Sequence, residues 1–453
     1  MKKAIIFGTG ISGRSAAELL LKHGVAVSVY CPEGADSTAA VALKESGAVI
    51  LDGDPVKAAK IFVSQACGDS VAYLSPGIPV SSPEADICRK AGIAITGELE
   101  TGARFLSSKI IAISGSKGKS SIVKLIADAL SMNGRKALPC ANYGIALTEI
   151  AGMQFKPDTA VAECSSFQLE TMGNIFKPET AAILNLYPDH LDRHGTMENY
   201  RNIKLAMFRN MEPDKLVLLP APSEDPYGLL ESYRKIYGRD AITFGRGADA
   251  QWRWRAGAVE NRDGSFRASI GRSYFDHEVH GPAAAAACAI LHNEGLSKDA
   301  IERAFARYEP LPHRMQFVGI IDGTRFVNDS KSTSFSSLAA AVRMSAPPVY
   351  LIAGGRLKGK IEIDVKEIVT FGVKKVYLIG ECMDEMSLAW GAELPVERCG
   401  TLDKAVSAAH MDASNGGTIL LSPGAASFDQ FKDYTQRGDT FTNLVRKLKT
   451  KRG

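Results

Sequence analysis

The sequence lacks the features that mark membrane, secreted and nucleic-acid-binding proteins. It has no run of about 18 apolar residues, and its N-terminus reads as a strand and not as a signal peptide. The net charge is only +4, which is too small to indicate a nucleic-acid partner. The eight cysteines show no C-x-x-C pair or metal spacing, as is usual in a reducing compartment. We therefore expect a cytoplasmic protein without membrane insertion and without a nucleic-acid partner.

The most informative segment that is present is a loop rich in glycine, lysine and serine. An apolar, strand-like run ends at Ile113, Gly-Ser-Lys-Gly-Lys-Ser follows at 115–120, and apolar residues then recur at helical spacing. Backbone N–H groups and the positive helix end would bind nucleotide phosphates there, with Lys119 at the terminal phosphates and Ser120 on Mg²⁺. The full P-loop pattern has glycine at the position of Ile113, so this loop is a shortened form. The alternative is an incidental Gly-Lys-Ser turn.

The N-terminal segment reads as a βαβ unit with a complete G-x-G-x-x-G pattern. Gly8-Thr-Gly-Ile-Ser-Gly13 follows a buried strand and opens a helix, and the next strand ends at Tyr30. In NAD-dependent oxidoreductases an acidic residue at the end of that second strand binds the ribose. Here Glu33 is displaced beyond a proline, which favours another phosphate-bearing ligand over NAD.

Further polar segments follow apolar strands, at the edge where open α/β sheets bind ligands. Ser75-Pro-Gly-Ile-Pro79 is either a second ligand loop of the first sheet or a plain Pro-Gly turn. Glu163 is either an Mg²⁺ ligand together with Ser120 or a salt-bridged structural residue. His190, between two aspartates, would ligate a second cation or orient a substrate, the alternative being a structural role.

The order of these segments predicts an α/β protein of three domains in series. The expected domains are a Rossmann-like domain at 1–106, a central P-loop-type domain with a mainly parallel sheet at 107–310, and a Rossmann-like domain at 311–453. The segment 251–257, with two tryptophans among arginines, reads as an inserted surface hairpin.

The chain resembles the Mur ligases of peptidoglycan synthesis, and most closely their D-glutamate-adding members. The resemblance runs the length of the chain and rests on eight motifs in order. These are Ser75–Pro79, Gly115–Ser120, Glu163–Glu170, Asp189–Arg193, Tyr200–Lys204, Pro312–Arg314, Asn328–Thr333 and Leu421–Phe431. The last motif, with Gln436-Arg-Gly438 behind it, is the most specific to the glutamate-adding members.

The resemblance implies an ATP-dependent amide ligase that joins D-glutamate to UDP-N-acetylmuramoyl-L-alanine through an acyl phosphate. We expect a monomer that uses ATP and two Mg²⁺ ions. The expected ATP-binding residues are Gly115, Ser116, Lys117, Gly118, Lys119, Ser120, Ser121, Asn142, Arg314, Asp329 and Lys331. The expected UDP-substrate-binding residues are Gly10, Ile11, Ser12, Ser75, Pro76, Gly77, Ser165 and Gln168. The expected D-glutamate-binding residues are Thr333, Lys358, Ser427, Phe428 and Tyr434.

The resemblance also implies catalytic and metal-binding roles. The expected catalytic residues are Lys119, His190, Lys204 and Arg314. One Mg²⁺ is expected on Ser120 and Glu163, and the other on His190 and Lys204. An ammonium would repel a cation, and the resemblance implies that CO₂ converts Lys204 to an anionic carbamate, which can serve as a ligand.

Three departures from the family pattern leave alternatives open. Lys117 stands where asparagine is usual, the run 283–287 is all alanine where adenine contacts are usual, and Arg356-Leu357 replaces Asp-Gly before Lys358. We therefore expect adenine to be held more weakly or otherwise, with Asn142 taking part of that role. The alternatives are a related ligase for another amino acid and a catalytically weakened paralogue that binds UDP-sugars as a sensor or scaffold.

Overall fold

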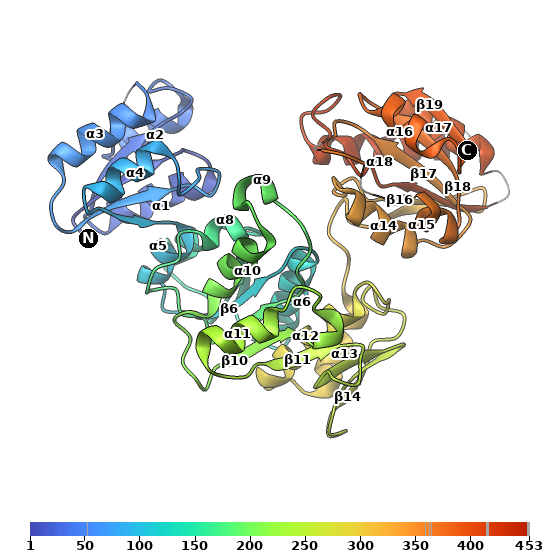
Figure 1. The fold of residues 1–453 in the computed structure, drawn as a ribbon, viewed down its shortest axis with the longest axis horizontal. Helices are drawn as coiled ribbons and strands as arrows, with labels where there is room; N and C mark the ends of the chain where they lie inside the picture. The colour runs from blue at the N-terminus through green and yellow to red at the C-terminus, as the bar shows by residue number, and fades with distance from the viewer. Residues whose placement is uncertain (52, 358, 362, 364, 414–415, 451–453) are drawn as a thin grey trace. The chain divides into compact units, whose positions relative to one another are not determined.

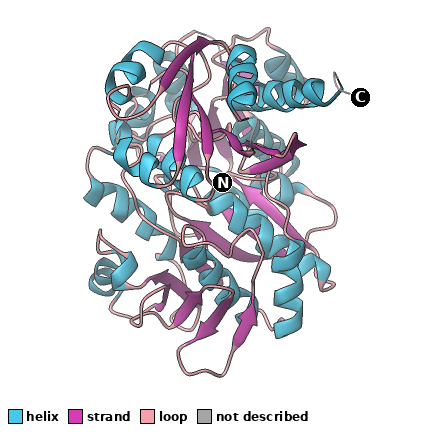
Figure 2. Cartoon of the chain, turned by 90° about the vertical axis from the view of Figure 1, so that its right-hand side faces the viewer, coloured by secondary structure: helices cyan, strands magenta, loops and turns pink. Residues whose placement is uncertain are grey.

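The computed structural model describes residues 1–51, 53–357, 359–361, 363, 365–413 and 416–450. They form three parallel-dominated β-sheets in series along the chain, each covered by helices, which confirms the predicted fold class (Figures 1 and 2). The chain divides into two compact units, Met1–Tyr308 with the first two sheets and Glu309–Gly453 with the third. Among the helices of the described residues, none combines the length and apolar character needed to cross a membrane.

The first sheet is parallel throughout, with the strand order β3-β2-β1-β4-β5. Its strands are β1 (Lys3–Phe7), β2 (Ala26–Tyr30), β3 (Val49–Leu51), β4 (Ser70–Leu74) and β5 (Ala94–Thr96). Its helices are α1 (Ile11–Lys22), α2 (Thr38–Glu45), α3 (Pro55–Gln65) and α4 (Pro83–Lys90). Because alternate residues of a strand face opposite sides, Ala4 and Ile6 pack with α1 and α2, whereas Ile5 and Phe7 pack with α3 and α4.

The loops after β1 and β4 meet at the carboxyl edge of the first sheet, where the strand order reverses. The Ser75 hydroxyl donates to the carbonyl oxygen of Gly8 at 3.3 Å. Gly13, in the first turn of α1, allows this approach, since a Cβ there would lie 2.0 Å from the same oxygen. The expectation that the two loops share one sheet edge is confirmed.

The second sheet has nine strands in the order β14-β13-β12-β11-β10-β9-β6-β8-β7, parallel from β7 to β12. Its strands are β6 (Lys109–Ser114), β7 (Ala137–Ala141), β8 (Thr159–Glu163), β9 (Thr180–Ile183), β10 (Leu216–Pro220), β11 (Ile242–Gly245), β12 (Trp252–Arg255), β13 (Ala258–Asn261) and β14 (Arg267–Ser269). The helices of this region are α5 (Glu98–Phe105), α6 (Lys119–Met132), α7 (Leu147–Gly152), α8 (Ser166–Leu169), α9 (Leu191–His194), α10 (Met197–Leu205), η1 (Ala206–Phe208), η2 (Pro222–Glu224), α11 (Leu229–Tyr237), α12 (Gly281–Asn293) and α13 (Lys298–Arg307). One face packs against α6, α12 and α13, and the other against α5, α7, α10 and α11.

The segment 251–257 supplies the first strand and the turn of a hairpin, as predicted, but this hairpin belongs to the second sheet and lies only partly at the surface. β12 pairs parallel with β11 and antiparallel with β13, so the hairpin extends the second sheet. Trp252 is buried in the core, with its ring 5.2 Å from that of Phe266. The arginines that suggested exposure lie on the same hairpin, where Arg253 and Arg255 pair with Glu260.

The third sheet has the order β15-β16-β20-β17-β18-β19 and is parallel except for β15 against β16. Its strands are β15 (Gln316–Ile321), β16 (Thr324–Asn328), β17 (Val349–Gly354), β18 (Val373–Ile379), β19 (Val396–Gly400) and β20 (Gly417–Leu421). Its helices are α14 (Phe335–Arg343), α15 (Val365–Thr370), α16 (Met383–Trp390), α17 (Leu402–Asp412) and α18 (Tyr434–Thr450). One face packs with α14, α15 and α16, and the other with α17 and α18.

Substitution of Gly13 by alanine is expected to destabilise the protein. The new Cβ would lie 2.0 Å from the Gly8 carbonyl oxygen and 2.8 Å from Ser75 Oγ, so both the backbone at Gly8 and the Ser75 side chain must shift. We expect a loss of about 1–3 kcal/mol, measured by denaturant unfolding. Gly10→Ala is the matched control, because Gly10 has φ −62° and nothing within 4 Å of a Cβ. Equal stability of the two variants would contradict this account of the loop contact.

Candidate active site

The loop at 115–118 joins β6 to α6 and has the conformation that its glycines permit. Gly118 is the N-cap of α6 with φ 81°, in the left-handed region that favours glycine. The first turn of α6 carries no acidic residue, so the positive helix end remains able to attract an anion. The Lys119 ammonium donates to the carbonyl oxygens of Gly115 at 2.8 Å and Ser116 at 3.1 Å. Ser120 and Ser121 are buried in the same turn.

Asn185, two residues after β9, fastens this loop. Its Oδ1 accepts from the backbone N–H groups of Ser116 at 3.1 Å and Lys117 at 2.9 Å. Its Nδ2 donates to the Lys117 carbonyl oxygen at 3.1 Å. Since these loop N–H groups are engaged by the protein itself, an anion would meet the loop further along, at the first turn of α6.

Lys204, on α10, is buried beside the same loop and is 1% exposed. Its ammonium donates to Gly115 O at 3.0 Å and lies 3.4 Å from Ser114 Oγ. Within the described chain, no carboxylate lies within salt-bridge distance of it. Burial, and next the charge of Lys119, hold the pKa of Lys204 well below its usual range. The neutral amine is therefore favoured more strongly here than in a lysine exposed to water.

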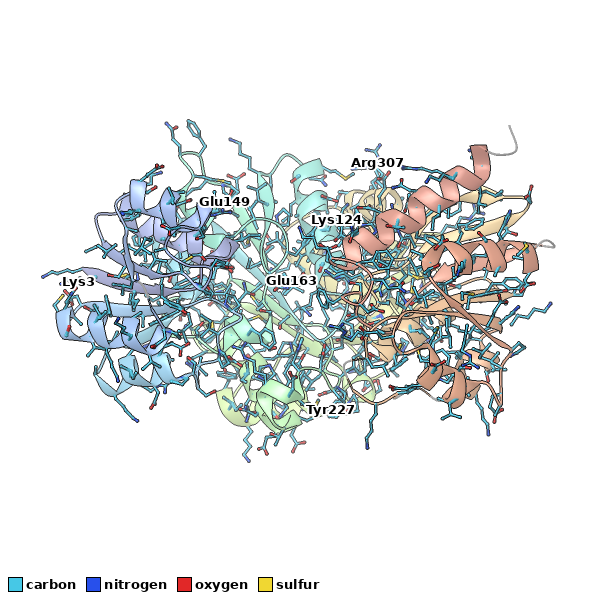
Figure 3. All side chains as sticks on the ribbon, turned by 90° about the horizontal axis from the view of Figure 1, so that it is seen from above. Lys3, Lys124, Glu149, Glu163, Tyr227 and Arg307 are labelled. Atoms are coloured by element: carbon cyan, nitrogen blue, oxygen red, sulfur yellow. The ribbon has the colours of Figure 1, made fainter. Side chains whose placement is uncertain are left out.

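Glu163, labelled in Figure 3, is the last residue of β8 and is 3% exposed. Its Oε1 accepts a hydrogen bond of 2.6 Å from Asn142 Nδ2. Its Oε2 is buried without a hydrogen-bond partner among the described atoms. The cation partner expected for a buried glutamate is therefore replaced by a neutral amide, and one carboxylate oxygen remains available to a cation.

His190 is the N-cap of α9 and has φ 53°, which is uncommon for a residue other than glycine. Its Nε2 lies 3.7 Å from Asp189 Oδ1, and its ring centroid lies 4.7 Å from that of Phe167. Burial lowers the pKa of His190 even though Asp189 opposes the shift. The imidazole is therefore neutral near neutral pH, which is the form that binds metals. Lys117 Nζ lies 3.7 Å from the other Asp189 oxygen, so the unusual lysine has a partner here.

Two of the expected UDP-substrate residues, Ser12 and Gln168, contact a glutamate that the sequence did not reveal. Glu98, at the start of α5, is buried and accepts from Ser12 Oγ at 3.1 Å, Gln168 Nε2 at 2.7 Å and Leu147 N at 2.8 Å. Burial raises its pKa. Ser165 caps α8 and exchanges hydrogen bonds with Gln168.

The remaining UDP-substrate residues lie on the two loops of the first sheet. Gly10 and Ile11 are exposed at the start of α1, while Ser75 and Pro76 are half-buried and Gly77 is exposed. The loop after β4 is closed by a hydrogen bond of 2.8 Å from Ile78 N to Ser75 O. The segment Ser75–Pro79 therefore does form a turn, and this turn leaves the expected role as a ligand loop open.

In the second compact unit, Asp329 follows β16 and is buried. Its Oδ2 accepts from Ser332 Oγ at 2.5 Å and Ser422 Oγ at 3.0 Å, and its Oδ1 accepts from Met315 N at 3.1 Å. Burial raises the pKa of Asp329 to about 6. The carboxylate therefore joins its own turn to the segments of Met315 and Ser422, in addition to its expected role in nucleotide binding.

Lys331 and Tyr434 form a second contact in this unit. Lys331 Nζ donates to the Tyr434 hydroxyl at 2.7 Å and lies 4.0 Å from the centre of its ring. A residue expected to contact ATP is thus joined to one expected to contact D-glutamate.

The other residues expected in the third domain have varied environments. Arg314 is half-buried, and its charge lowers the pKa of Asp329 against the larger effect of burial. Thr333 is half-buried, Ser427 is buried and Phe428 is 63% exposed. Lys358 lies outside the described residues. Arg356, beside it in sequence, forms a two-pronged ion pair with Glu381 at 2.9 and 2.7 Å.

The alanine run at 283–287 is core and not a row of ligand contacts. It lies in α12, which packs against α6, and its members are 0–9% exposed. Small side chains allow the two helices to approach closely at this position. The run is thus accounted for by packing, and any contact to a nucleotide base must come from other residues.

Sequence reasoning missed Asn185 and Glu98. For Asn185 a signal existed, since it lies two residues past the apolar strand β9, at the sheet edge where Glu163 at the end of β8 also lies. For Glu98 there was none, because its partners lie 49, 70 and 86 residues away along the chain.

Comparison with known proteins identifies the family. The model of the Mur ligase middle domain matches residues 113–283. The UDP-N-acetylmuramoylalanine–D-glutamate ligase of Myxococcus xanthus is 35% identical over 99% of this chain and 98% of its own length. The ligase of the same name from Acidobacterium capsulatum is 33% identical over 98% and 96%.

Solved structures support the fold. The UDP-N-acetylmuramate-alanine ligase of Thermotoga maritima matches with a TM-score of 0.57 at 15% identity, covering 99% of this chain and 100% of its own. A MurF structure from Acinetobacter baumannii matches with a TM-score of 0.57 at 16% identity, covering 87% and 89%. The full-length relatives, at 33–35% identity, show that the chain belongs to the Mur ligase family.

Proposed function

We propose that this protein is an ATP-dependent amide ligase that adds D-glutamate to UDP-N-acetylmuramoyl-L-alanine in peptidoglycan precursor synthesis. The observation that carries the proposal is full-length similarity, at 30–35% identity, to relatives that all bear the name of that activity. The loop at 115–118, with Lys119 and Lys204 on one carbonyl oxygen, supports the same chemistry.

The reaction has two steps. The terminal carboxylate of the UDP-linked substrate attacks the γ-phosphoryl group of ATP, which releases ADP and forms an acyl phosphate. The amine of D-glutamate then attacks the carbonyl carbon and loses a proton, and inorganic phosphate leaves. The first step brings anions together, so cationic groups must offset their repulsion. In the central domain Lys117, Lys119 and the N-terminus of α6 serve this purpose.

Two Mg²⁺ ions are part of the proposal. The Oε2 atom of Glu163, which is buried with no hydrogen-bond partner in the described part of the chain, fits a cation, and with Ser120 it would hold the first ion. In the described part of the chain no three His, Cys, Asp or Glu side chains form a metal-binding group, so phosphate oxygens and waters must complete the coordination. Bound Mg²⁺ would neutralise the charge of the phosphates.

The second ion is assigned to His190 and carbamoylated Lys204. Only a neutral amine reacts with CO₂, and burial lowers the pKa of Lys204 in the direction that supplies this form. The product is an anionic carbamate in place of a cation, which converts a repulsive neighbour of Mg²⁺ into a ligand.

The residues that bind each substrate are assigned from the motifs of the same family. Residues Gly10–Ser12, Ser75–Gly77, Ser165 and Gln168 would bind the UDP-linked substrate. Thr333, Lys358, Ser427, Phe428 and Tyr434 would bind D-glutamate, and Arg314, Asp329 and Lys331 would contact ATP. We further propose a cytoplasmic monomer with domain boundaries near residues 106 and 310.

The direct test is phosphate release by the purified protein. With ATP, Mg²⁺ and UDP-N-acetylmuramoyl-L-alanine, release should require D-glutamate and fail with L-glutamate and other D- and L-amino acids. Preference for a different amino acid would identify a related ligase, and binding of the UDP-sugar without any phosphate release would identify a sensor or scaffold. Either result would refute the proposed activity.

The carbamate is tested through Lys204→Ala. Loss of a metal ligand should lower kcat by at least about 100-fold, and millimolar acetate or formate should restore part of it by supplying a carboxylate. Lys119→Ala is the matched control, because it removes a cation from the same loop and an added carboxylate cannot replace that. If acetate fails to rescue Lys204→Ala, or rescues both variants equally, the carbamate assignment is wrong.

Asn185→Ala tests whether the loop must be fastened. The variant removes the acceptor of two backbone N–H groups, and at about 1 kcal/mol for each bond we expect roughly a tenfold or greater rise in KM for ATP. Asn133→Ala is the control, since Asn133 Nδ2 donates to Ala129 O at the far end of the same helix. An unchanged KM for ATP in Asn185→Ala would show that the loop keeps its form without this residue.

A further inference from the structure

Arg193 joins two loops that the proposed function uses. It lies in α9, three residues after His190, and its side chain is 12% exposed. Its NH1 donates to Pro76 O at 2.8 Å and its NH2 to Ile78 O at 3.1 Å. Both acceptors belong to the loop after β4, so α9 is fastened to that loop at two points.

The guanidinium is held in this position by a buried acid. Nε donates to both oxygens of Glu170 at 3.0 and 3.2 Å, and NH2 donates to Oε2 at 2.5 Å. The Glu170 side chain is 6% exposed, so the pair is shielded from water. The planar fork of arginine can serve a carboxylate and two carbonyl oxygens at once, which a lysine cannot do.

The same arrangement sets the His190 ring. The Arg193 guanidinium lies 4.2 Å from the centre of the Phe167 ring, and the His190 ring lies 4.7 Å from the same phenyl group. The carbonyl oxygen of His190 accepts from the backbone N–H groups of Arg193 at 3.1 Å and His194 at 3.0 Å. Arg193 and His190 are thus coupled through the short helix and through one aromatic ring.

We propose that Arg193, supported by Glu170, is a positioning residue that sets the loop 75–78 relative to His190. The inference rests on the proposed function, in which that loop binds the UDP-linked substrate. In this role Arg193 acts through the protein and not by contact with the reacting atoms: it fixes the distance between the loop 75–78 and the turn that would ligate a metal. Loss of the Arg193 side chain should therefore weaken the binding of the UDP-linked substrate and leave the binding of ATP and D-glutamate unchanged.

The test is binding and kinetics of the full chain with Arg193→Ala, Arg193→Lys and Glu170→Gln. Calorimetric titration with UDP-N-acetylmuramoyl-L-alanine, without ATP, should show the Kd rising roughly 10- to 100-fold in Arg193→Ala, as expected for the loss of hydrogen bonds from a charged group. KM for ATP and D-glutamate should change less than about threefold, and millimolar guanidinium ion should restore part of the affinity of Arg193→Ala. Arg193→Lys should remain impaired, because one ammonium cannot reach both carbonyl oxygens and Glu170.

Arg135→Ala is the matched control. Arg135 also pairs with a buried glutamate, Glu294, at 2.8 Å, but it precedes β7 at the amino edge of the sheet. Its loss should leave the Kd of the UDP-linked substrate unchanged. If Arg193→Ala does not fold, the Kd of the UDP-linked substrate is measured for Arg193→Lys and Glu170→Gln instead, and a rise is again expected.

Several outcomes would overturn the proposal. The first is an unchanged Kd for the UDP-linked substrate in folded Arg193 variants. The second is a rise in the KM for ATP and D-glutamate as large as the rise in that Kd. The third is a rise in that Kd in Arg135→Ala as large as in Arg193→Ala. The proposed function fails separately, if the unaltered protein binds the UDP-linked substrate but releases no phosphate with D-glutamate. In that case the calorimetric comparison still decides the role of Arg193.

Discussion

The burial of a lysine beside the phosphate loop is the constraint on which the central site depends. An ammonium removed from water must find a carboxylate or give up its proton more readily. Around Lys204 the nearest partners are neutral oxygens of Gly115 and Ser114, and the positive charge of Lys119 acts on it more strongly than the carboxylates of Asp189 and Glu163. The site thus contains a buried amine that loses its proton more readily than a lysine in water does, which suits the proposed carbamate.

Neutral hydrogen-bonding groups hold this charged site in place. Asn185 orders the loop through amide contacts that add no charge, and Asn142 holds one oxygen of Glu163, while the other has no hydrogen-bond partner among the residues that the structure describes. A lysine or arginine in either place would already occupy the position of a cation. The two amides therefore fix the positions of the loop 115–118 and of Glu163, and bound ligands would balance the charges of the site.

Single charged groups also connect the regions of the first and second sheets. Glu98 gathers Ser12, Leu147 and Gln168 around one buried carboxylate, and Arg193 gathers two loop carbonyl oxygens and Glu170 around one guanidinium. Each is a single charged group with several donors or acceptors, so the segments that it joins cannot shift independently. In this way residues proposed to bind the UDP-linked substrate are tied to the turn that carries His190.

Much of the fold and part of the site could be predicted from the sequence. The period of apolar residues determined the strands and helices, since burial of one face or both is a local requirement. The Gly-Lys-Ser loop and the polar residues after β8 and β9 were recognisable because carboxyl ends of parallel strands share one edge. Only the tertiary structure decided that the alanine run and Trp252 are core, and that Glu98 and Arg193 act as junctions. The physical reason is distance along the chain: Arg193 and Pro76 are 117 residues apart, and their contact exists only because folding brings two strand ends together.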